Sequence, residues 1–348
     1  MSNRSHYNSG HIGMNILKKN NQRHSSMKKY YLQQVTYHGI FIEDSIDFLK
    51  KVPDSSIQLI LIDPPYNIDV ASWDNYDNYM DWAKEWISQI ERILTDDGNF
   101  VIFGGFQYQD EAKTGDLLEI MHYLRHNTKL KFINFIVWHY KTGMSAQRFF
   151  ANRHEEILWF AKTRKYYFNL DDVRTPFDEE TKIRYKKDKR LKPESIDKGK
   201  NPTNVWEIER LIGNAKERVG HPTQKPLDVI RRLVRGLSYP GSIVMDFFAG
   251  SGTTGIAAIE EMRNSILVDN DPKTIEYFEE HSRKLSERLI NTQSNYTLFN
   301  FSNHNHYEVV KDKSLEDFLK IVDKERKKAI IINLEERVDG NLNDTDAK

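Results

Sequence analysis

The fold of this chain is decided by residues 57–66, which read IQLILIDPPY. The first six residues form an unbroken apolar run bounded by polar residues, a pattern typical of a buried strand. The chain then leaves the strand stiffly through Asp63, Pro64, Pro65 and Tyr66, because prolines fix their own φ angles and lack N–H donors. Open α/β sheets bind ligands at the carboxyl ends of their strands, so the sequence predicts a binding site here.

The tetrapeptide suits a planar group that carries an exocyclic amine. The Asp63 carboxylate and the Pro64 carbonyl can each accept one amine hydrogen, and the Tyr66 ring can stack on the plane. Stacking of this kind is worth about 1–3 kcal/mol per base. The alternative is an ordinary strand followed by a proline-rich turn, which is disfavoured because the whole set of four follows an all-apolar strand directly.

Composition bounds the class of protein. With 348 residues, 39% of them hydrophobic and 29% charged, the chain can form one large α/β domain or two smaller ones and is expected to be soluble. No run approaches the roughly 18 apolar residues of a membrane span. The N-terminus has no signal-type apolar core, so we expect a cytoplasmic, nucleoid-associated protein that needs no membrane. The absence of cysteine excludes thiolate zinc sites and cysteine nucleophiles, and no metal site is expected.

Strand and helix patterns alternate before about residue 162 and again after about residue 221. This alternation predicts an α/β fold with a Rossmann-like, mostly parallel sheet and helices on both faces. A helix is expected from residue 221, with Pro226 in its first turn. We expect a mobile tail over 1–35, a catalytic domain over 36–162 and 216–290, an irregular insert over 163–215, and an extension of unknown role over 291–348.

The insert contains a basic run although the chain as a whole is neutral, with 51 basic and 51 acidic residues. Between Lys182 and Lys200 there are nine Lys and Arg against three acids. A protein that binds nucleic acid needs such a local basic surface. An ordinary solvated surface is the alternative interpretation.

A second motif, DFFAGSGTTG, occupies residues 246–255 between a predicted strand and a predicted helix. Its glycines satisfy G-x-G-x-x-G, which lets the backbone turn sharply and approach a ligand closely. Asp269, at the tip of the next strand, can accept hydrogen bonds from ribose hydroxyls. By spacing alone this is also a dinucleotide site, and an NAD-dependent oxidoreductase therefore stays open as a rival function.

S-adenosylmethionine fits the second motif better than a dinucleotide does. Asp246 would face a pyrophosphate badly, but it would face an ammonium and a sulfonium well. The adenine can lie against Phe247 or Phe248, and the ribose against Asp269. The cofactor carboxylate needs a cation, for which Lys225 at the start of a predicted helix is suited.

Three motifs together resemble the amino-methyltransferases of bacterial DNA, which modify adenine N6 or cytosine N4. They are DPPY at 63–66, HPTQKP at 221–226 and DFFAGSGTT at 246–254. With the amine motif first and the cofactor motif last, their order resembles the β permutation class of restriction–modification enzymes. The likeness covers roughly residues 36–290 and includes NIDVASWD, RHEEILWFAK and VWEI.

The resemblance implies the methyltransferase fold that uses S-adenosylmethionine, double-stranded DNA as substrate, and the insert as target-recognition region. It implies that Asp63, Pro64, Pro65 and Tyr66 hold the target base. The implied cofactor residues are Asp246, Phe247, Phe248, Ala249, Gly250, Ser251, Gly252, Thr253, Thr254 and Asp269, completed by Thr223 and Lys225. The family commonly has Glu where this chain has Asp269. The basic residues expected to contact DNA are Lys186, Lys187, Lys189 and Arg190.

Asp63, rather than Ser, in the first position of the tetrapeptide favours adenine N6 over cytosine N4, with base flipping. The absence of cysteine excludes the covalent route to cytosine C5. The insert and the motif order disfavour an RNA methyltransferase and a protein-amide methyltransferase. A non-catalytic DNA-binding relative is disfavoured because all three motifs are intact. The recognition sequence, a partner restriction endonuclease and a homodimer stay open.

Overall fold

The apolar run of the opening motif is strand β3 (Ile57–Ile62), which is fully buried at the centre of a nine-stranded sheet. The computed structural model describes residues 29–32, 35–67, 74–105, 117–143, 145, 147, 150–291, 306–328 and 330–333. Neighbouring strands are parallel except at β6, which is antiparallel to both of its neighbours. The spatial order is β10 (His306–Val310), β2 (Val35–Ile42), β9 (Asn264–Asp269), β8 (Ile243–Asp246), β3, β4 (Leu94–Gly104), β6 (His154–Ala161), β5 (Lys131–His139) and β7 (Val205–Glu207). The predicted Rossmann-like, mostly parallel sheet is thus confirmed.

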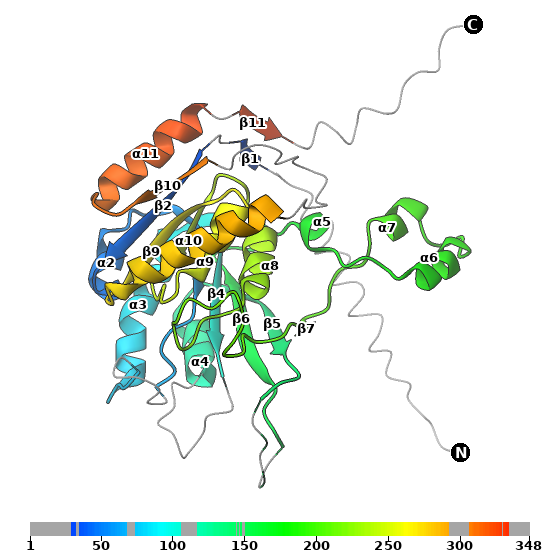
Figure 1. The fold of residues 1–348 in the computed structure, drawn as a ribbon, viewed down its shortest axis with the longest axis horizontal. Coiled ribbons are helices and arrows are strands. Elements are labelled where there is room, and N and C mark those ends of the chain that lie inside the picture. The colour runs from blue at the N-terminus through cyan, green and yellow to red at the C-terminus, as the bar shows by residue number, and fades with distance from the viewer. Residues whose placement is uncertain are drawn as a thin grey trace, which may run out of the picture.

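Helices cover both faces of this sheet, as the alternating pattern predicts (Figure 1). Ile60 and Ile62 of β3 pack on one side, and Leu59 and Leu61 on the other. The first layer holds α2 (Ser45–Lys51), α3 (Tyr79–Ile93), α4 (Leu117–Asn127) and α11 (Leu315–Lys328), and the second α8 (Leu227–Leu237), α9 (Thr253–Glu260) and α10 (Lys273–Asn291). Within the part of the chain that the structure describes, every helix is too short or too polar to span a bilayer.

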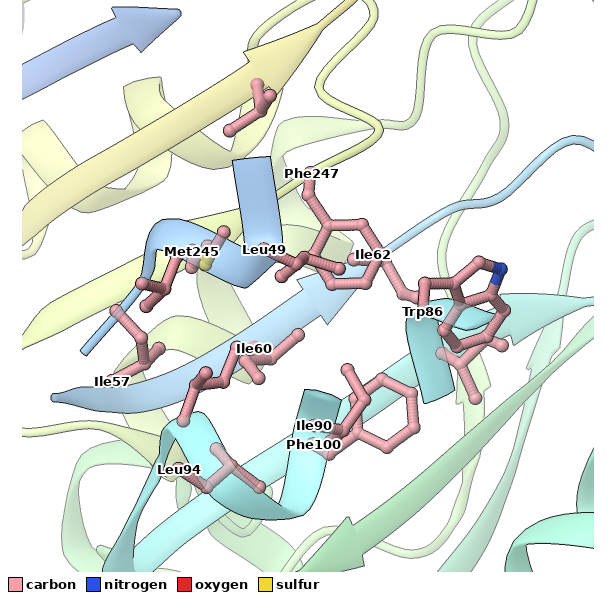
Figure 2. Packing of buried hydrophobic residues seen from close by; sticks show 14 of the residues in the cluster. Leu49, Ile57, Ile60, Ile62, Trp86, Ile90, Leu94, Phe100, Met245 and Phe247 are labelled. Atoms are coloured by element: carbon pink, nitrogen blue, oxygen red, sulfur yellow. The ribbon is translucent and has the colours of Figure 1, made fainter. Parts of the chain in front are cut away.

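The side chains around β3 hold the strand rigidly (Figure 2). Trp86 of α3 is fully buried, and its ring lies 5.9 Å from the ring of Phe247, which follows β8. Met245 and Phe100 fill the space beside the strand. Each such side chain contributes about 1.5–3 kcal/mol by its burial. The residues that follow β3 therefore start from a fixed position.

The expected helix from residue 221 is wrong in its start, because α8 begins only at Leu227. Pro226 occupies the N-cap position, and Pro222 also interrupts the segment before it. The first free N–H of the helix, on Leu227, donates to the Glu217 carboxylate at 2.7 Å. Lys225 consequently lies in the non-helical segment before the helix.

The predicted insert is not irregular throughout. It contains α5 (Leu170–Val173), α6 (Glu179–Lys186), α7 (Pro193–Asp197) and the edge strand β7. Thr175 and Lys200 exchange two backbone hydrogen bonds of 2.9 Å, which close residues 176–199 into a lobe. The lobe, with α6 and α7, stands away from the sheet beyond α5 (Figure 1). The Asn169 N–H donates to the carbonyl of Gly236, near the C-terminal end of α8, so the lobe is rooted at that end.

The two ends of the chain contribute more structure than their polarity predicts. Strand β10 extends the sheet beside β2, and α11 covers it with the fully buried ring of Phe318. Strand β1 (Lys29–Leu32), inside the predicted tail, pairs with β11 (Ile330–Asn333). The apolar stretches of β1 and β10 are too short to show a period. The sequence does predict α11, as an amphipathic segment over 314–327, and β11, as the strand-like AIIINL at 329–334. The rest of the predicted tail and extension lies outside the described residues.

Candidate active site

Four acids from separate strands meet at one edge of the sheet. Asp246 and Asp269 end the parallel strands β8 and β9, and Asp63 directly follows their parallel neighbour β3. Glu155 begins β6, and because β6 runs antiparallel its first residues lie at the same edge. All four acids line one cavity of about 350 Å³. Small-molecule sites typically enclose about 300–1,000 Å³.

The amine half of the cavity consists of Asp63, Tyr66, Glu155 and Lys225. The Lys225 Nζ lies 2.8 Å from Asp63 Oδ2 and 3.2 Å from Glu155 Oε2. The Tyr66 hydroxyl donates to Asp63 Oδ1 at 2.8 Å. Burial alone would lower the pKa of Lys225, but the two carboxylates outweigh it and raise that pKa. Burial also raises the pKa of Glu155, which Lys225 offsets only in part.

The carbonyl groups of the two prolines differ in their partners. The Tyr79 hydroxyl donates to the Pro65 carbonyl at 2.8 Å and so fixes the turn after the strand. No described residue donates a hydrogen bond to the Pro64 carbonyl, and Pro64 lines the cavity. The Pro64 carbonyl and the Asp63 carboxylate are thus adjacent acceptors beside the same space.

Three aromatic rings form one wall of the cavity. Tyr76 stacks on Trp82 with ring centroids 4.3 Å apart, and Trp82 lies 5.5 Å from Phe248. All three rings line the cavity. Of the two phenylalanines expected to contact an adenine, Phe248 faces the cavity, whereas Phe247 is fully buried in the core.

The cofactor half of the cavity consists of Asp246, Asp269 and the glycine turn 250–252. Asp246 accepts hydrogen bonds from the Thr254 hydroxyl at 2.6 Å and from the Phe248 N–H at 3.1 Å. Asp269 accepts from the N–H groups of Gly250 and Asp271, at 2.7 and 2.9 Å. An ionised carboxylate has about four acceptor positions, so each acid keeps acceptor capacity for a ligand. Among the described residues, neither acid has a cationic partner, and burial raises the pKa of Asp246 to about 7.

The turn between β8 and α9 requires glycine at two positions. Gly250 has a φ of +46° and Gly252 a φ of +72°, in the left-handed region. A Cβ on Gly250 would lie 3.0 Å from the ring of His221, and one on Gly252 would lie 2.8 Å from Phe278. A side chain at either position would therefore be strained by its backbone conformation and would crowd His221 or Phe278.

The cofactor half fits S-adenosylmethionine. Carboxylates without a cationic partner suit a ligand that carries an ammonium and a sulfonium, and the aromatic wall suits its adenine. The hydroxyls of Ser251 and Thr253, 2.9 Å apart, lie at the start of α9 beside the same space. Lys225, expected to hold the cofactor carboxylate, instead has its ammonium between Asp63 and Glu155.

The structure brings most of the predicted site residues together. Asp63, Pro64, Pro65, Tyr66, Thr223, Lys225, Asp246, Phe248, Ala249, Gly250, Ser251, Thr253, Thr254 and Asp269 line the cavity, whereas Phe247 and Gly252 do not. Sequence reasoning missed Glu155, Arg210, Arg218 and His221, which also line it. The signal for Glu155 was present in RHEEILWFAK, where an acid stands at the beginning of an apolar strand.

The basic residues predicted to contact DNA lie on the lobe and do not line the cavity. Lys186 forms an ion pair with Asp197, and Arg190 with Asp188, each at 2.7 Å. Lys187 and Lys189 are exposed. The lobe thus presents a basic surface, though part of its charge is compensated locally.

Comparison with known proteins places this geometry in context. Residues 57–280 match the N6/N4 family model described as DNA methylase. The chain is 36% identical to the type II methyltransferase M.BglII of Bacillus subtilis, over 71% of this chain and 69% of that one. It is 31% identical to the DNA adenine methyltransferase YhdJ of Escherichia coli K12, over 73% of this chain and 83% of that one. The fold resembles the PvuII DNA methyltransferase (cytosine-N4-specific), with a TM-score of 0.55, 17% identity and coverage of 85% and 96%.

Proposed function

This chain belongs to the N6/N4 DNA methylase family, and we propose that it methylates the N6 amine of adenine at a specific site in duplex DNA. The observation that carries the proposal is the pair of adjacent acceptors, the Asp63 carboxylate and the Pro64 carbonyl, beside a cavity that reaches the cofactor half. Together they match an NH2 group, which has two hydrogens to donate. An oxidoreductase, the rival function of the glycine turn, would leave these acceptors without a substrate.

The cofactor of the family is S-adenosylmethionine, which supplies an electrophilic methyl group when bound. Phe248 and the aromatic wall would hold its adenine, and Asp269 its ribose hydroxyls. The Asp246 carboxylate would face its positive charge. The N-terminus of α9, with the hydroxyls of Ser251 and Thr253, would accept its carboxylate, because Lys225 is already held by two acids.

The residues of the amine half prepare the nitrogen for attack. The lone pair of an adenine amine is delocalised into the ring, which makes the amine a poor nucleophile. Acceptance of both amine hydrogens by Asp63 and Pro64 favours a pyramidal nitrogen whose lone pair points away from them. Tyr66 and Lys225 fix the Asp63 carboxylate from both of its oxygens, at 2.8 Å each, so little reorganisation remains. Positioning of this kind supplies several kcal/mol of the barrier.

The target base must leave the duplex to reach these acceptors, because Asp63 lies inside the cavity with only 20% of its side chain exposed. Extrusion of a base costs a few kcal/mol. The Tyr66 ring lines the cavity, with the Lys225 ammonium 5.2 Å from its centroid, and would offset part of that cost by stacking on the base.

We assign the first DNA contacts to the mouth of the cavity. Arg210 is exposed, lines the cavity and lies 5.7 Å from the ring of Tyr140. A guanidinium there can hold a phosphate of the extruded nucleotide. The lobe, with Lys186, Lys187, Lys189 and Arg190, would contact DNA outside this point and contribute to target recognition.

Adenine is favoured over cytosine by the residue type of Asp63 and by the relative that is named as a DNA adenine methyltransferase. Relatives named as type II methyltransferases support a role beside a restriction endonuclease that cuts the same sequence.

The test is a labelled-cofactor assay on unmethylated bacterial DNA, with RNA and protein as alternative substrates. The DNA is then hydrolysed to nucleosides and separated by chromatography. We expect the label in N6-methyladenine. Label in N4-methylcytosine would overturn the assignment of the base, and label in RNA or protein alone would overturn the assignment of DNA.

A further inference from the structure

We propose that Glu155 stores the proton that the target amine loses, which it receives from Asp63 by way of Lys225. The inference rests on the proposed function and deepens it, because no motif assigns a role to Glu155. Its basis is the arrangement of charges in the amine half.

Two carboxylates share one ammonium in this half. Lys225 Nζ is within ion-pair distance of both Asp63 and Glu155, at 2.8 and 3.2 Å. The side chains are largely buried, with 11% of Lys225 and 17% of Glu155 exposed. Desolvation of a surplus charge is costly. One carboxylate would suffice to compensate Lys225, so the second has another role.

The two acids differ in how strongly their charged forms are stabilised. Both oxygens of Asp63 have a donor at 2.8 Å, the Tyr66 hydroxyl on one and the Lys225 ammonium on the other. Among the residues that the structure describes, Glu155 Oε2 has only longer contacts, 3.2 Å to Lys225 and 3.5 Å to Tyr66. Burial raises the pKa of Glu155. A proton that enters this group of residues is therefore held best by Glu155.

The chemical balance of the step is simple. As the amine nitrogen bonds to the methyl carbon, the carbon–sulfur bond breaks and its electron pair remains on sulfur. The nitrogen then carries one proton too many, which passes to Asp63. Lys225 donates one of its protons to Glu155 Oε2, and the neutral amine that results accepts the proton from Asp63 Oδ2. The result is a neutral methylated amine, with Asp63 and Lys225 again charged, and with Glu155 protonated and the surplus negative charge removed.

The groups that face Glu155 define what a pH experiment will report. From other elements these are Lys225, Asp63 and Tyr66, which the contacts above describe. On its own strand, His154 and Glu156 pair with each other at 2.8 Å. Across the cavity lie Asp246 and His221. Saturation with cofactor removes the titration of Asp246 from the rate profile, since its effect is on cofactor affinity.

Glu155→Gln is the decisive variant, because glutamine keeps the shape and the acceptor for Lys225 but cannot take up the proton. Glu155→Asp keeps the titration and serves as the rescue. We expect Glu155→Gln to lower the single-turnover rate about 100-fold, within the range of general acid–base effects, and to move the fall of the rate to lower pH, because Asp63 must still be ionised to accept the amine hydrogens. Glu155→Asp should recover a rate that falls at low pH. Both variants should bind cofactor within about twofold of the wild-type protein.

A second measurement does not depend on activity. Carbon-13 NMR of labelled glutamate side chains, without cofactor, should show one carboxyl that titrates above its ordinary pKa of 4.5 and disappears in Glu155→Gln. A wild-type rate in Glu155→Gln, or a reduced rate whose fall at low pH occurs at the same pH as in the wild-type protein, overturns the proposal, as does the absence of the titrating carboxyl. If the wild-type protein methylates no DNA amine, the proposed function fails separately, and the NMR result shows whether Glu155 still behaves as assigned.

Discussion

The two halves of the cavity treat their carboxylates in opposite ways. In the amine half, Asp63 and Glu155 share the Lys225 ammonium. In the cofactor half, Asp246 and Asp269 accept only from neutral donors, with no cationic partner among the described residues. The first arrangement holds an acceptor rigidly with most of its charge compensated, whereas the second leaves negative charge available to a cationic ligand. Acids at the same edge of the sheet thus differ in their chemistry because the groups around them differ.

The largest effect should come from removal of the acceptor in the amine half. We expect Asp63→Ala to lower the single-turnover rate by at least about 100- to 1,000-fold, the usual reduction when a preorganised polar group beside the reacting atom is removed. Cofactor affinity should remain within about twofold, because Asp63 faces the amine, and Lys225 keeps Glu155 as a partner. Rapid-quench kinetics and calorimetry measure the two quantities.

Asp96→Ala is the matched control for that variant, since the Asp96 side chain is 89% exposed. It should leave both quantities unchanged. Normal turnover by Asp63→Ala would show that the amine half takes no part in the reaction. A large loss of cofactor affinity would show that the two halves do not have separate roles.

The next effect should come from removal of charge in the cofactor half. Asp246→Asn keeps the shape of the side chain. We expect it to lower the affinity for S-adenosylmethionine about 10- to 100-fold, which corresponds to the free energy of one charge-assisted hydrogen bond. The affinity for the product, which lacks the sulfonium charge, should fall less. Calorimetric titration with both ligands checks the ratio, and equal losses would show that charge is not the cause.

The same carboxylate gives this half a pH dependence. Burial raises the pKa of Asp246 to about 7, so the charged form that favours the cofactor appears as the pH rises through that value. Affinity for S-adenosylmethionine should therefore increase between about pH 6 and pH 8. The stability of the ligand-free protein should change in the opposite direction and decrease as the pH rises. Folding raises the pKa of this carboxyl, so its contribution to stability is complete below the ordinary pKa of an aspartate and is lost as the pH rises through about 7. Asp246→Asn should remove both trends in calorimetry and thermal unfolding.

A smaller effect, on the stability of the protein, is expected from the glycine turn 250–252, whose contribution to the cofactor half depends on its backbone conformation. Gly250→Ala places a Cβ 3.0 Å from the His221 ring at a φ of +46°, and should destabilise the protein by about 1–3 kcal/mol. Gly213→Ala is the control, because a Cβ there meets no atom within 4 Å. Thermal unfolding should separate the two variants by several degrees. Equal melting temperatures would mean that the turn relaxes without cost.

The parts of the site that could be predicted are those whose chemistry is local. The apolar run and the prolines fix the end of β3, and the left-handed glycines fix the turn before α9. Each of these features needs only a few adjacent residues. Residue types alone therefore suffice to place the tetrapeptide and the glycine turn at the edge of the sheet.

The parts that could not be predicted depend on strand direction and pairing. Glu155 reaches the cavity only because β6 is antiparallel, and Lys225 meets its two acids only because α8 begins after Pro226. The edge strand β7 has three residues, too few to show a period, and it joins the sheet through its register with β5. The acid before the apolar run of β6 is visible in the sequence, but the direction and the partners of that strand, which bring the acid to the cavity, leave no trace in local composition.

The smallest effect should come from the lobe, which belongs to neither half. It is rooted near the C-terminal end of α8, and that helix of 11 residues is roughly 16 Å long, so the lobe's root is remote from Lys225. We expect Lys187→Ala with Lys189→Ala to weaken DNA binding several-fold and to reduce the slope of log affinity against log salt by about 0.9 for each phosphate that the variant no longer neutralises. Lys186→Ala should weaken DNA binding less, because Lys186 is paired with Asp197.

The single-turnover rate of the double variant at saturating DNA should equal that of the wild-type protein. Arg210→Ala changes a residue at the cavity and should therefore lower kcat/KM for DNA more than the double variant does. Unchanged affinity of the double variant at every salt concentration would remove the lobe from DNA binding, and a changed rate at saturating DNA would show that it acts on the amine half after all.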